Sequence, residues 1–479
     1  MRMTDIPPVS RRAVLKHGAV ALALATGGRA LGRARAQQRH PLLTTDFESP
    51  SRYADPDERL DDFEDVDAWS EDEGSLSADT NEVYRGSQSA RLSTPANSDA
   101  DALAISREFD ELDLSDRDLS LALRLGDPDT EQLVVEVEDD EGDYVEMNRR
   151  TISPTYGWFR IDLGVTDETG DPDLSSVEEI RIRFNRDSDD PMLVWLDDLG
   201  TTPRVDGGRV VLTFDDGGIT QYTRALPVLE SFGFPAVTCV NTGRVDRDDY
   251  LGESEMREMR AAGWEIGSHT VDHRDLPELS NDEARRQVAD AKQWLLDRGF
   301  EVGSAIFTYP WSGTSPRIRS IVSDHHYLAF TDGSMPHGAR LTGPLTVGRV
   351  FGENRDRVET TLDLAEKYGQ TVVLAYHQVG AGGWISESAF RETMNGIAER
   401  GLDVIKPSTL LTELLDPPVT EIEPLSVPRV VARDGDIELA DVQRAVHWNE
   451  QDAYVPRTNG EKMDDETLAE ILEMWENGR

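Results

Sequence analysis

The stretch that decides the fold is Arg209-Val-Val-Leu-Thr-Phe-Asp-Asp-Gly217. Residues 209–214 form a mostly apolar run that is typical of a strand buried on both faces of a parallel sheet. Two adjacent carboxylates, Asp215 and Asp216, follow this run, and Gly217 then permits a turn. Parallel α/β folds build their active sites at the carboxyl ends of strands. The stretch therefore predicts a buried parallel strand that carries two candidate site residues at its end.

Strands and helices alternate on both sides of this stretch, over residues 205–413. Residues 235–240 and 371–376 predict two more buried strands. Ser280-Asn-Asp-Glu283 is a capping box that predicts a helix start, and Gly299 predicts its end. This alternation favours an α/β layered or barrel fold.

Two histidines four residues apart follow another predicted strand end, in His269-Thr-Val-Asp-His273. If the chain turns there, both imidazoles can converge on one metal ion. A carboxylate as third ligand completes a set that leaves one coordination position open for water. The order of these motifs and their places at strand ends make them a candidate catalytic metal site.

With these motifs, the block over residues 205–413 resembles the polysaccharide deacetylase family, also called the NodB-homology or carbohydrate esterase 4 family. Thr213–Gly217 and His269–His273 match the family's first two motifs. Phe307-Thr-Tyr-Pro-Trp311 occupies the place of the third, and Leu374-Ala-Tyr-His377 resembles the last. The resemblance implies a distorted (β/α) barrel with fewer than eight complete units, which removes acetyl groups from N- or O-acetylated polysaccharide.

The resemblance also implies a role for each motif residue. A divalent metal, most often Zn2+, would be bound by three residues, Asp216, His269 and His273. Asp215 would be the general base that activates water, and His377 the general acid that protonates the leaving amine or alcohol. The backbone N–H of Trp311 would donate to the oxyanion.

The third motif departs from the family pattern, because Thr308 stands where the family usually has an arginine that orients the base. A subgroup with Phe-x-Tyr-Pro in this motif also lacks that arginine, so activity is not excluded. Arg349 is the nearest replacement, and an ordinary structural arginine is the alternative reading. Asp332, which follows the predicted strand 327–330, is a further candidate for the barrel mouth.

Residues 41–202 consist of short alternating runs, such as Leu133–Glu138 and Ile180–Phe184, separated by turn residues. This pattern predicts an all-β sandwich. Asp62–Trp69, Tyr84–Leu92 and Leu196–Leu199 resemble parts of jelly-roll carbohydrate-binding modules, which often hold a structural Ca2+ near such a terminal aspartate. A sugar-binding domain and an accessory sandwich without a ligand are both open.

Three tryptophans of this block have two alternative roles, either stacking on sugar rings or filling the core. They are Trp69, Trp158 and Trp195.

Prolines and acidic residues over 414–432 predict an extended linker, and residues 433–479 predict a short helical module. Two predicted helices, each after a glycine (Gly435 and Gly460), resemble a degenerate dockerin. The candidate calcium ligands Asp434, Asp436 and Asp441 are few, so a plain helical hairpin is the first expectation. A cell-surface partner that binds this module is the matching hypothesis.

Residues 1–36 resemble a twin-arginine export signal. Arg11-Arg12 precede a small-residue stretch, Gly18–Ala25, and Ala34-Arg-Ala36 is a candidate cleavage site. The apolar stretch is too short to span a bilayer, and no later segment is long enough. We expect an exported protein, extracellular or at the cell surface, without a transmembrane segment.

The charge of the chain is extreme: 49 basic and 93 acidic residues give a net charge of −44. Only five of the basic residues are lysines. Such a surface is typical of adaptation to high salt, where self-repulsion is screened. Nucleic acid is excluded as a partner because no basic stripe is present. The single cysteine, Cys239, excludes an internal disulfide framework.

Two functions from different classes therefore stand. The first is an exported, salt-adapted, metal-dependent carbohydrate deacetylase. The second is a secreted glycan-binding or surface-assembly protein whose barrel is vestigial. The presence of all five polar motif residues argues against decay of the site, namely Asp215, Asp216, His269, His273 and His377.

Overall fold

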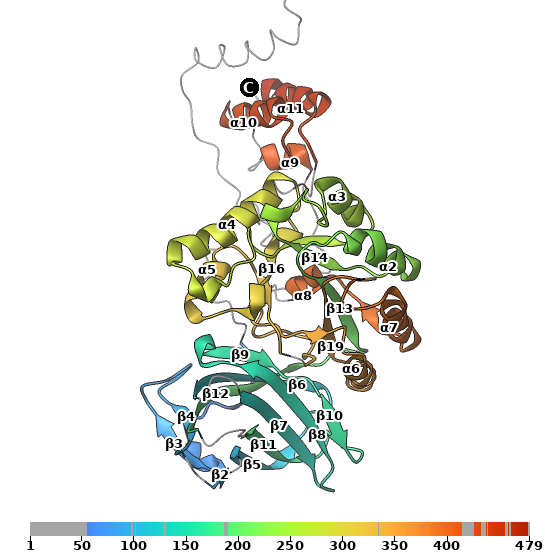
Figure 1. The fold of residues 1–479 in the computed structure, drawn as a ribbon. Coiled ribbons are helices and arrows are strands. Elements are labelled where there is room, and N and C mark those ends of the chain that lie inside the picture. The colour runs from blue at the N-terminus through green and yellow to red at the C-terminus, as the bar shows by residue number, and fades with distance from the viewer. Residues whose placement is uncertain are drawn as a thin grey trace, which may run out of the picture. The chain divides into compact units, whose positions relative to one another are not determined.

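A computed structural model describes residues 55–96, 99–100, 102–127, 131–185, 190–333, 335–380, 382–413, 426–432, 437, 439–455, 458 and 461–477 (Figure 1). The predicted signal, residues 1–36, and the first part of the predicted linker lie outside these ranges. By internal contacts the chain divides into two units. One contains residues 45–294 and 302–422, and the other contains residues 295–301 and 423–479.

The first unit begins with two antiparallel sheets that share one apolar core. The first sheet has the order β3 (Ser75–Asp79), β4 (Ser89–Thr94), β12 (Met192–Pro203), β6 (Arg117–Asp127) and β9 (Phe159–Asp162), with β1 (Glu58–Asp61) also paired to β12. The second has the order β10 (Asp167–Thr169), β8 (Tyr144–Ile152), β7 (Glu131–Asp139), β11 (Val177–Asn185), β5 (Ala102–Leu112) and β2 (Ser70–Glu73). The predicted all-β region is confirmed.

Alternating side chains build this core as the sequence predicts. Leu133, Val135 and Val137 are fully buried, and Glu136 and Glu138 between them are partly exposed. Period-two alternation sends every second side chain of a strand to the inner face of its sheet.

Two of the three tryptophans of the sandwich belong to the core. Trp69 stacks on Phe63, and its indole donates to Asp61 at 2.9 Å. Trp195 is also buried, and its indole donates to Asp79 at 3.0 Å. Neither ring is available to stack on a sugar, whereas Trp158 is partly exposed.

The second part of this unit is a parallel sheet that curves into an open barrel. Its strand order is β17 (Leu328–Phe330), β16 (Ile306–Thr308), β15 (Glu265–Ser268), β14 (Val237–Val240), β13 (Arg209–Phe214), β19 (Thr371–Tyr376) and β18 (Val350–Phe351), with β20 (Asp403–Val404) also paired to β13. The middle strands are buried along almost their whole length, as expected of a parallel sheet covered on both faces.

The strand predicted to start at Pro235 begins instead at Val237. Proline has no N–H to donate to the ladder, so pairing with β13 starts after it.

Helices alternate with these strands, as the strand-end motifs predict. They are α2 (Leu226–Phe232), α3 (Glu253–Ala261), α4 (Asn281–Asp297), α5 (Pro316–Ser323), α6 (Arg355–Tyr368), α7 (Glu387–Glu399) and α8 (Pro407–Glu413). The capping box at the start of α4 is present, since the Ser280 hydroxyl accepts from the N–H of Glu283 at 3.4 Å and the Glu283 carboxylate accepts from the N–H of Ser280 at 3.3 Å. A π-helix, η4 (Gln221–Ala225), precedes α2.

The second unit contains three described helices, α9 (Val427–Val431), α10 (Leu439–Glu450) and α11 (Asp465–Asn477). They share an apolar cluster that includes Val430, Ala445 and Ile471. Helix α9 corrects the end of the predicted extended linker: Pro428 is tolerated in a first helical turn, and the valines around it are buried. Asp434 and Asp436, two of the candidate calcium ligands here, lie outside the described residues.

Candidate active site

The candidate base is the first residue after β13. Asp215 is 3% exposed, and the guanidinium of Arg349 donates to both of its oxygens, Nη1 to Oδ1 at 2.9 Å and Nη2 to Oδ2 at 2.8 Å. Arg349 is also 3% exposed. Burial alone would raise the pKa of Asp215, but the charge and hydrogen bonds of Arg349 together with the nearby histidines outweigh it and lower that pKa well below its usual value. The structure thus joins Arg349 to the base as an ion pair between residues 134 positions apart.

Three side chains converge beside this pair. The ligand atoms of Asp216, His269 and His273 all lie within 4.8 Å of one another, and they are the one such group of His, Cys, Asp and Glu found among the described residues. Asp216 Oδ1 lies 3.5 Å from His273 Nε2 and 3.9 Å from His269 Nε2. That oxygen is buried without a hydrogen-bond partner. An orphaned carboxylate oxygen between two imidazoles fits a divalent metal ion.

The two histidines are prepared to act as neutral ligands. His269 Nδ1 lies 2.8 Å from the carbonyl oxygen of Thr308, so this nitrogen carries the proton and leaves the Nε2 lone pair facing Asp216. Burial lowers the pKa of His273 to about 4. An imidazole must be neutral to bind a metal ion.

Backbone conformation at the ligands is unusual for residues other than glycine. Asp216, Thr270 and His273 have φ values of 71°, 69° and 59°. Left-handed conformations of such residues cost free energy and are often found at functional sites. They turn the chain so sharply after each strand that the ligands face one another.

The candidate acid lies on the neighbouring strand. Phe214 of β13 pairs with Tyr376 of β19, so Asp215 and His377 follow equivalent positions. Burial disfavours the charged form of His377, but the neighbouring carboxylates of Glu353 and Asp215 outweigh this and raise the pKa of His377. Glu353 Oε1 lies 3.9 Å from His377 Nδ1. The arrangement favours a protonated His377 close to an ionised Asp215.

The turn that carries the candidate oxyanion donor is also in the left-handed region. Trp311 and Ser312 have φ values of 58° and 56°. The Trp311 ring packs edge-on against His273 with the ring centroids 5.0 Å apart, and it is 73% exposed. A second indole, Trp384, lies over His377 at a centroid distance of 4.1 Å and is 64% exposed. Two exposed indoles therefore flank the polar residues of the site.

Sequence reasoning missed two residues of this site. Glu353 has no motif of its own, and only its position after β18 could have suggested it. Gln221 is fully buried in η4, where its amide donates to the carbonyl oxygens of Asp215 at 2.6 Å and His377 at 3.1 Å. It fixes the ends of β13 and β19 relative to each other, a role that no local pattern reveals.

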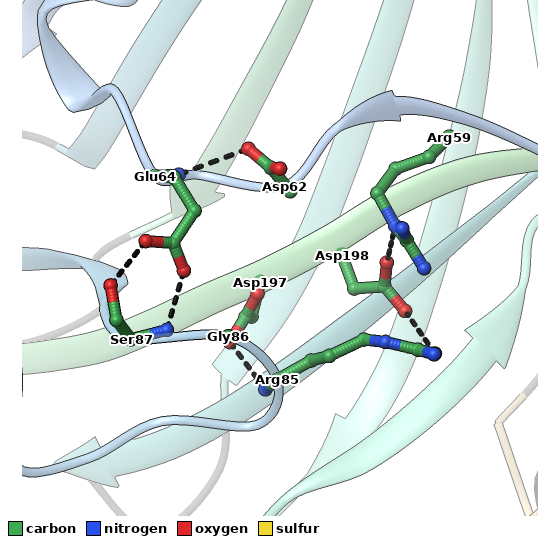
Figure 2. A pocket seen from close by; sticks show the side chains of 8 residues that line it. All are labelled: Arg59, Asp62, Glu64, Arg85, Gly86, Ser87, Asp197 and Asp198. Carbon is green, nitrogen blue, oxygen red and sulfur yellow. Dashed lines mark hydrogen bonds and ion pairs between the residues drawn. The ribbon is translucent and has the colours of Figure 1, made fainter.

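The predicted calcium region of the sandwich is a pocket of about 390 Å3, shown in Figure 2. Asp198 pairs there with Arg59, and behind the pocket with Arg160 at 2.6 Å. Glu64 accepts hydrogen bonds from Ser87. Figure 2 shows that these carboxylates face protein donors rather than a shared centre.

One oxygen of this pocket, Asp197 Oδ1, is buried without a partner. Ca2+ takes six to eight oxygen ligands, which include backbone carbonyls and waters, so a structural Ca2+ at this place stays a prediction.

Comparison with known proteins shows which family part of the barrel resembles. Residues 202–330 match the family model described as Polysaccharide deacetylase. YxkH of Bacillus subtilis (strain 168), whose name assigns it to the polysaccharide deacetylases, is 36% identical over 101 residues. This overlap covers 21% of the present chain and 36% of YxkH, so the chain spans about a third of that curated relative. The barrel segment 202–330 is thus a polysaccharide deacetylase domain.

Solved structures of deacetylases also overlap this region. Streptococcus pyogenes deacetylase PplD in complex with acetate is 27% identical, with coverage of 29% of this chain and 62% of PplD and a TM-score of 0.27. Peptidoglycan deacetylase PdaC from Bacillus subtilis is 21% identical, with coverage of 44% and 93% and a TM-score of 0.32. Arg349, Glu353 and His377 lie beyond the segment that the family model matches.

Proposed function

We propose that this protein is a metal-dependent hydrolase that removes acetyl groups from an N- or O-acetylated polysaccharide. The observation that carries the proposal is the meeting of two sets of residues at one sheet edge. One is the ligand group Asp216, His269 and His273, and the other is the ion-paired carboxylate of Asp215. The deacetylase match of residues 202–330 and the two exposed indoles beside the site support an acetylated glycan as substrate.

In this proposal the side chains of the chain divide the proton transfers. Asp215, held ionised by Arg349, takes a proton from the attacking water. His377, whose raised pKa favours the charged form, gives a proton to the leaving amine or alcohol. The backbone N–H of Trp311 stabilises the oxyanion of the tetrahedral intermediate. Base and acid follow neighbouring strands, so the acetyl group lies between them.

The ligand group would hold a divalent ion, for which we propose Zn2+. Such an ion polarises the acetyl carbonyl and lowers the pKa of water. Two imidazoles and one carboxylate are a ligand set that zinc accepts. Arg244, whose Nη1 lies 3.7 Å from Asp216 Oδ1, is the nearest cation to these ligands.

We propose that the chain is exported by the twin-arginine route and acts outside the cell in high salt. The motif Arg11-Arg12 and the net charge of −44 support this proposal. In the part of the chain that the structure describes, no helix is long and apolar enough to cross a bilayer. A surface partner of the C-terminal helices stays a hypothesis.

The test is acetate release from a panel of acetylated glycans in molar salt, with metal content measured on the same samples. The panel contains N-acetylated chitin oligosaccharides and O-acetylated xylan. We expect release from at least one substrate class by the wild-type protein and a large loss in Asp215→Asn. A folded, metal-loaded protein that releases no acetate from any of them would leave the glycan-binding alternative as the better reading.

A further inference from the structure

The open side of the barrel faces the sandwich within the first unit. β17 and β18 are the two ends of the strand path, and the chain that joins them runs over residues 331–349. Asp162, at the end of sandwich strand β9, accepts from the backbone N–H groups of Thr342 at 2.8 Å and Gly343 at 3.1 Å. Asp118 of β6 accepts from the N–H of Ala339 at 3.0 Å. Buried carboxylates of the sandwich thus hold the segment that crosses the gap.

One residue of the sandwich reaches farther toward the site. Arg149 of β8 is 1% exposed, and its Nη2 donates to the Thr331 hydroxyl at 3.3 Å. The same guanidinium lies against Gly333 and Gly348, where an added Cβ would come within 2.1 Å of Nη1. A side chain at either glycine would displace Arg149. The arginine is therefore inserted between the start and the end of the crossing segment.

The next contact links this arginine to the candidate base. Asp332 follows Thr331, and its Oδ1 is buried without a hydrogen-bond partner, 3.8 Å from Arg349 Nη2. That nitrogen also donates to Asp215 at 2.8 Å, so Asp332 and Asp215 compete for one guanidinium. Arg149 contacts both residues that flank Asp332, namely Thr331 and Gly333. A second buried cation offsets Asp332 and leaves Arg349 to Asp215.

The sandwich also contacts the turn that carries Trp311 and Ser312. The hydroxyl of Tyr156 donates to the carbonyl of Ser312 at 3.4 Å, and the Ser312 hydroxyl accepts from the N–H of Asp332 at 3.0 Å. Arg319 of α5 donates to the carbonyl oxygens of Tyr156 and Trp158. The left-handed turn at Trp311 and Ser312 needs such outside support to persist.

We infer that the sandwich is a built-in part of the catalytic unit, and that Arg149 is a positioning residue that acts on Asp215 through Asp332 and Arg349. This inference rests on the proposed function. Burying a guanidinium with so few partners costs folding free energy. The presence of Arg149 at this place despite that cost supports a role in positioning its neighbours. Among the described residues the large exposed apolar side chains are Trp311, Trp384 and Met474, none of them in the sandwich, whose Trp158 is only partly exposed.

The test uses full-length Arg149→Met, with Arg183→Met as matched control. Arg183 also lies in a sandwich strand, but it pairs across strands with Glu136 at 3.1 Å. We expect Arg149→Met to lower kcat about 10- to 100-fold, the usual scale for misplaced catalytic groups, with KM within about threefold and metal content unchanged. The control should keep kcat. An Arg149→Met enzyme with wild-type kcat overturns the inference.

Two further variants separate positioning from a general loss of stability. If Asp332 is the link, Asp332→Asn should restore most of the kcat lost in Arg149→Met, because the competing charge is gone. If Arg349 is the next link, Arg149→Met should add little to the loss in Arg349→Met. Absence of rescue together with additive losses would show that Arg149 acts elsewhere.

Hydrogen exchange tests the positioning step without activity. Amides of residues 331–333 and 311–313 should exchange faster in Arg149→Met than in Arg183→Met or wild type. Unchanged exchange in these segments contradicts the inference even if the wild-type protein releases no acetate. A wild type without activity would overturn the proposed function alone. If Arg149→Met does not fold, Arg149→Lys and Asp332→Asn are compared by the same exchange and kcat measurements.

Discussion

Each of the two parts of the first unit, the sandwich and the barrel, contains an Asp-Asp pair, and the surroundings of the two pairs differ. In each pair one aspartate is neutralised by a buried arginine, Asp215 by Arg349 and Asp198 by Arg160. The other aspartate of the barrel pair, Asp216, turns a free oxygen toward two histidines. Its counterpart in the sandwich, Asp197, accepts from two backbone N–H groups at 2.9 Å.

The difference comes from where each pair lies on its strand. Asp215 and Asp216 follow the end of a parallel strand, where side chains project into the barrel mouth. Asp197 and Asp198 lie inside antiparallel β12, at an irregularity in its pairing with β6. Burial raises the pKa of Asp197 to about 6, against the lowering effect of its N–H donors. The same dipeptide therefore lies beside candidate metal ligands in one place and inside a strand pairing in the other.

The largest effect is expected at the candidate metal ligands. His269→Ala or Asp216→Ala should each abolish the binding of about one divalent ion per chain. Activity should fall at least about 1000-fold, since polarisation by the metal stabilises the transition state by several kcal/mol. Metal analysis of the purified protein checks this. Asp197→Ala should keep that ion. Stoichiometric metal in both barrel variants would refute the site, and loss of calcium from Asp197→Ala would show that the sandwich also holds an ion.

Substitution of the two arginine-paired aspartates, Asp215 and Asp198, should have different effects on kcat but similar effects on stability. Asp215→Asn should keep the metal and lose at least about 100-fold in kcat, the usual scale for a general base. Asp198→Asn also breaks a buried ion pair and should lower the thermal midpoint, but its folded fraction should retain kcat. Near-normal turnover by Asp215→Asn would show that Asp215, like Asp198, has only a structural role.

A smaller effect is expected at Glu353, which has no counterpart beside the sandwich pair. Glu353 raises the pKa of His377, and the acid must be protonated to act. In Glu353→Gln that pKa falls, so the basic limb of the kcat profile should move to lower pH. We expect a loss of about tenfold at neutral pH. A basic limb that stays in place would assign the acid role to another group.

The smallest effect is expected on the thermal midpoint as salt is added, which distinguishes repulsion between surface charges from the contribution of the buried ion pairs. With a net charge of −44, added KCl should raise the thermal midpoint, by about 2–4 °C for each kcal/mol of screened repulsion. The decrease in midpoint caused by Arg349→Met should be similar at low and high salt, because a buried pair is little screened. A midpoint that is indifferent to KCl would argue against salt adaptation.

Much of the barrel could be predicted from the sequence, because its signals are local. The run 209–214, the capping box at Ser280 and the spacing of His269 and His273 each specify a strand, a helix start or a turn within a few residues. The candidate metal group then follows from the common edge of parallel strands. Arg349 was reachable as a hypothesis from its position just before β18, although it does not itself lie in a strand.

The roles of several other residues depended on tertiary structure. Glu353 and Gln221 reach the site from segments without a motif, and Arg149 comes from another sheet, 182 residues before its partner Thr331. Trp69 and Trp195 left a choice between sugar platform and core that only packing resolved.

The sequence by itself determined which residue types stand at the strand ends, because strand length and turn chemistry are encoded locally. Only the tertiary structure decided which of the two Asp-Asp pairs, each with one buried unpartnered oxygen, meets two histidines. That outcome depends on the partners that long-range folding brings to each carboxylate, two imidazoles in one case and backbone N–H groups in the other. Pairing energies of this kind are properties of the assembled surroundings, and no segment of the chain specifies them alone.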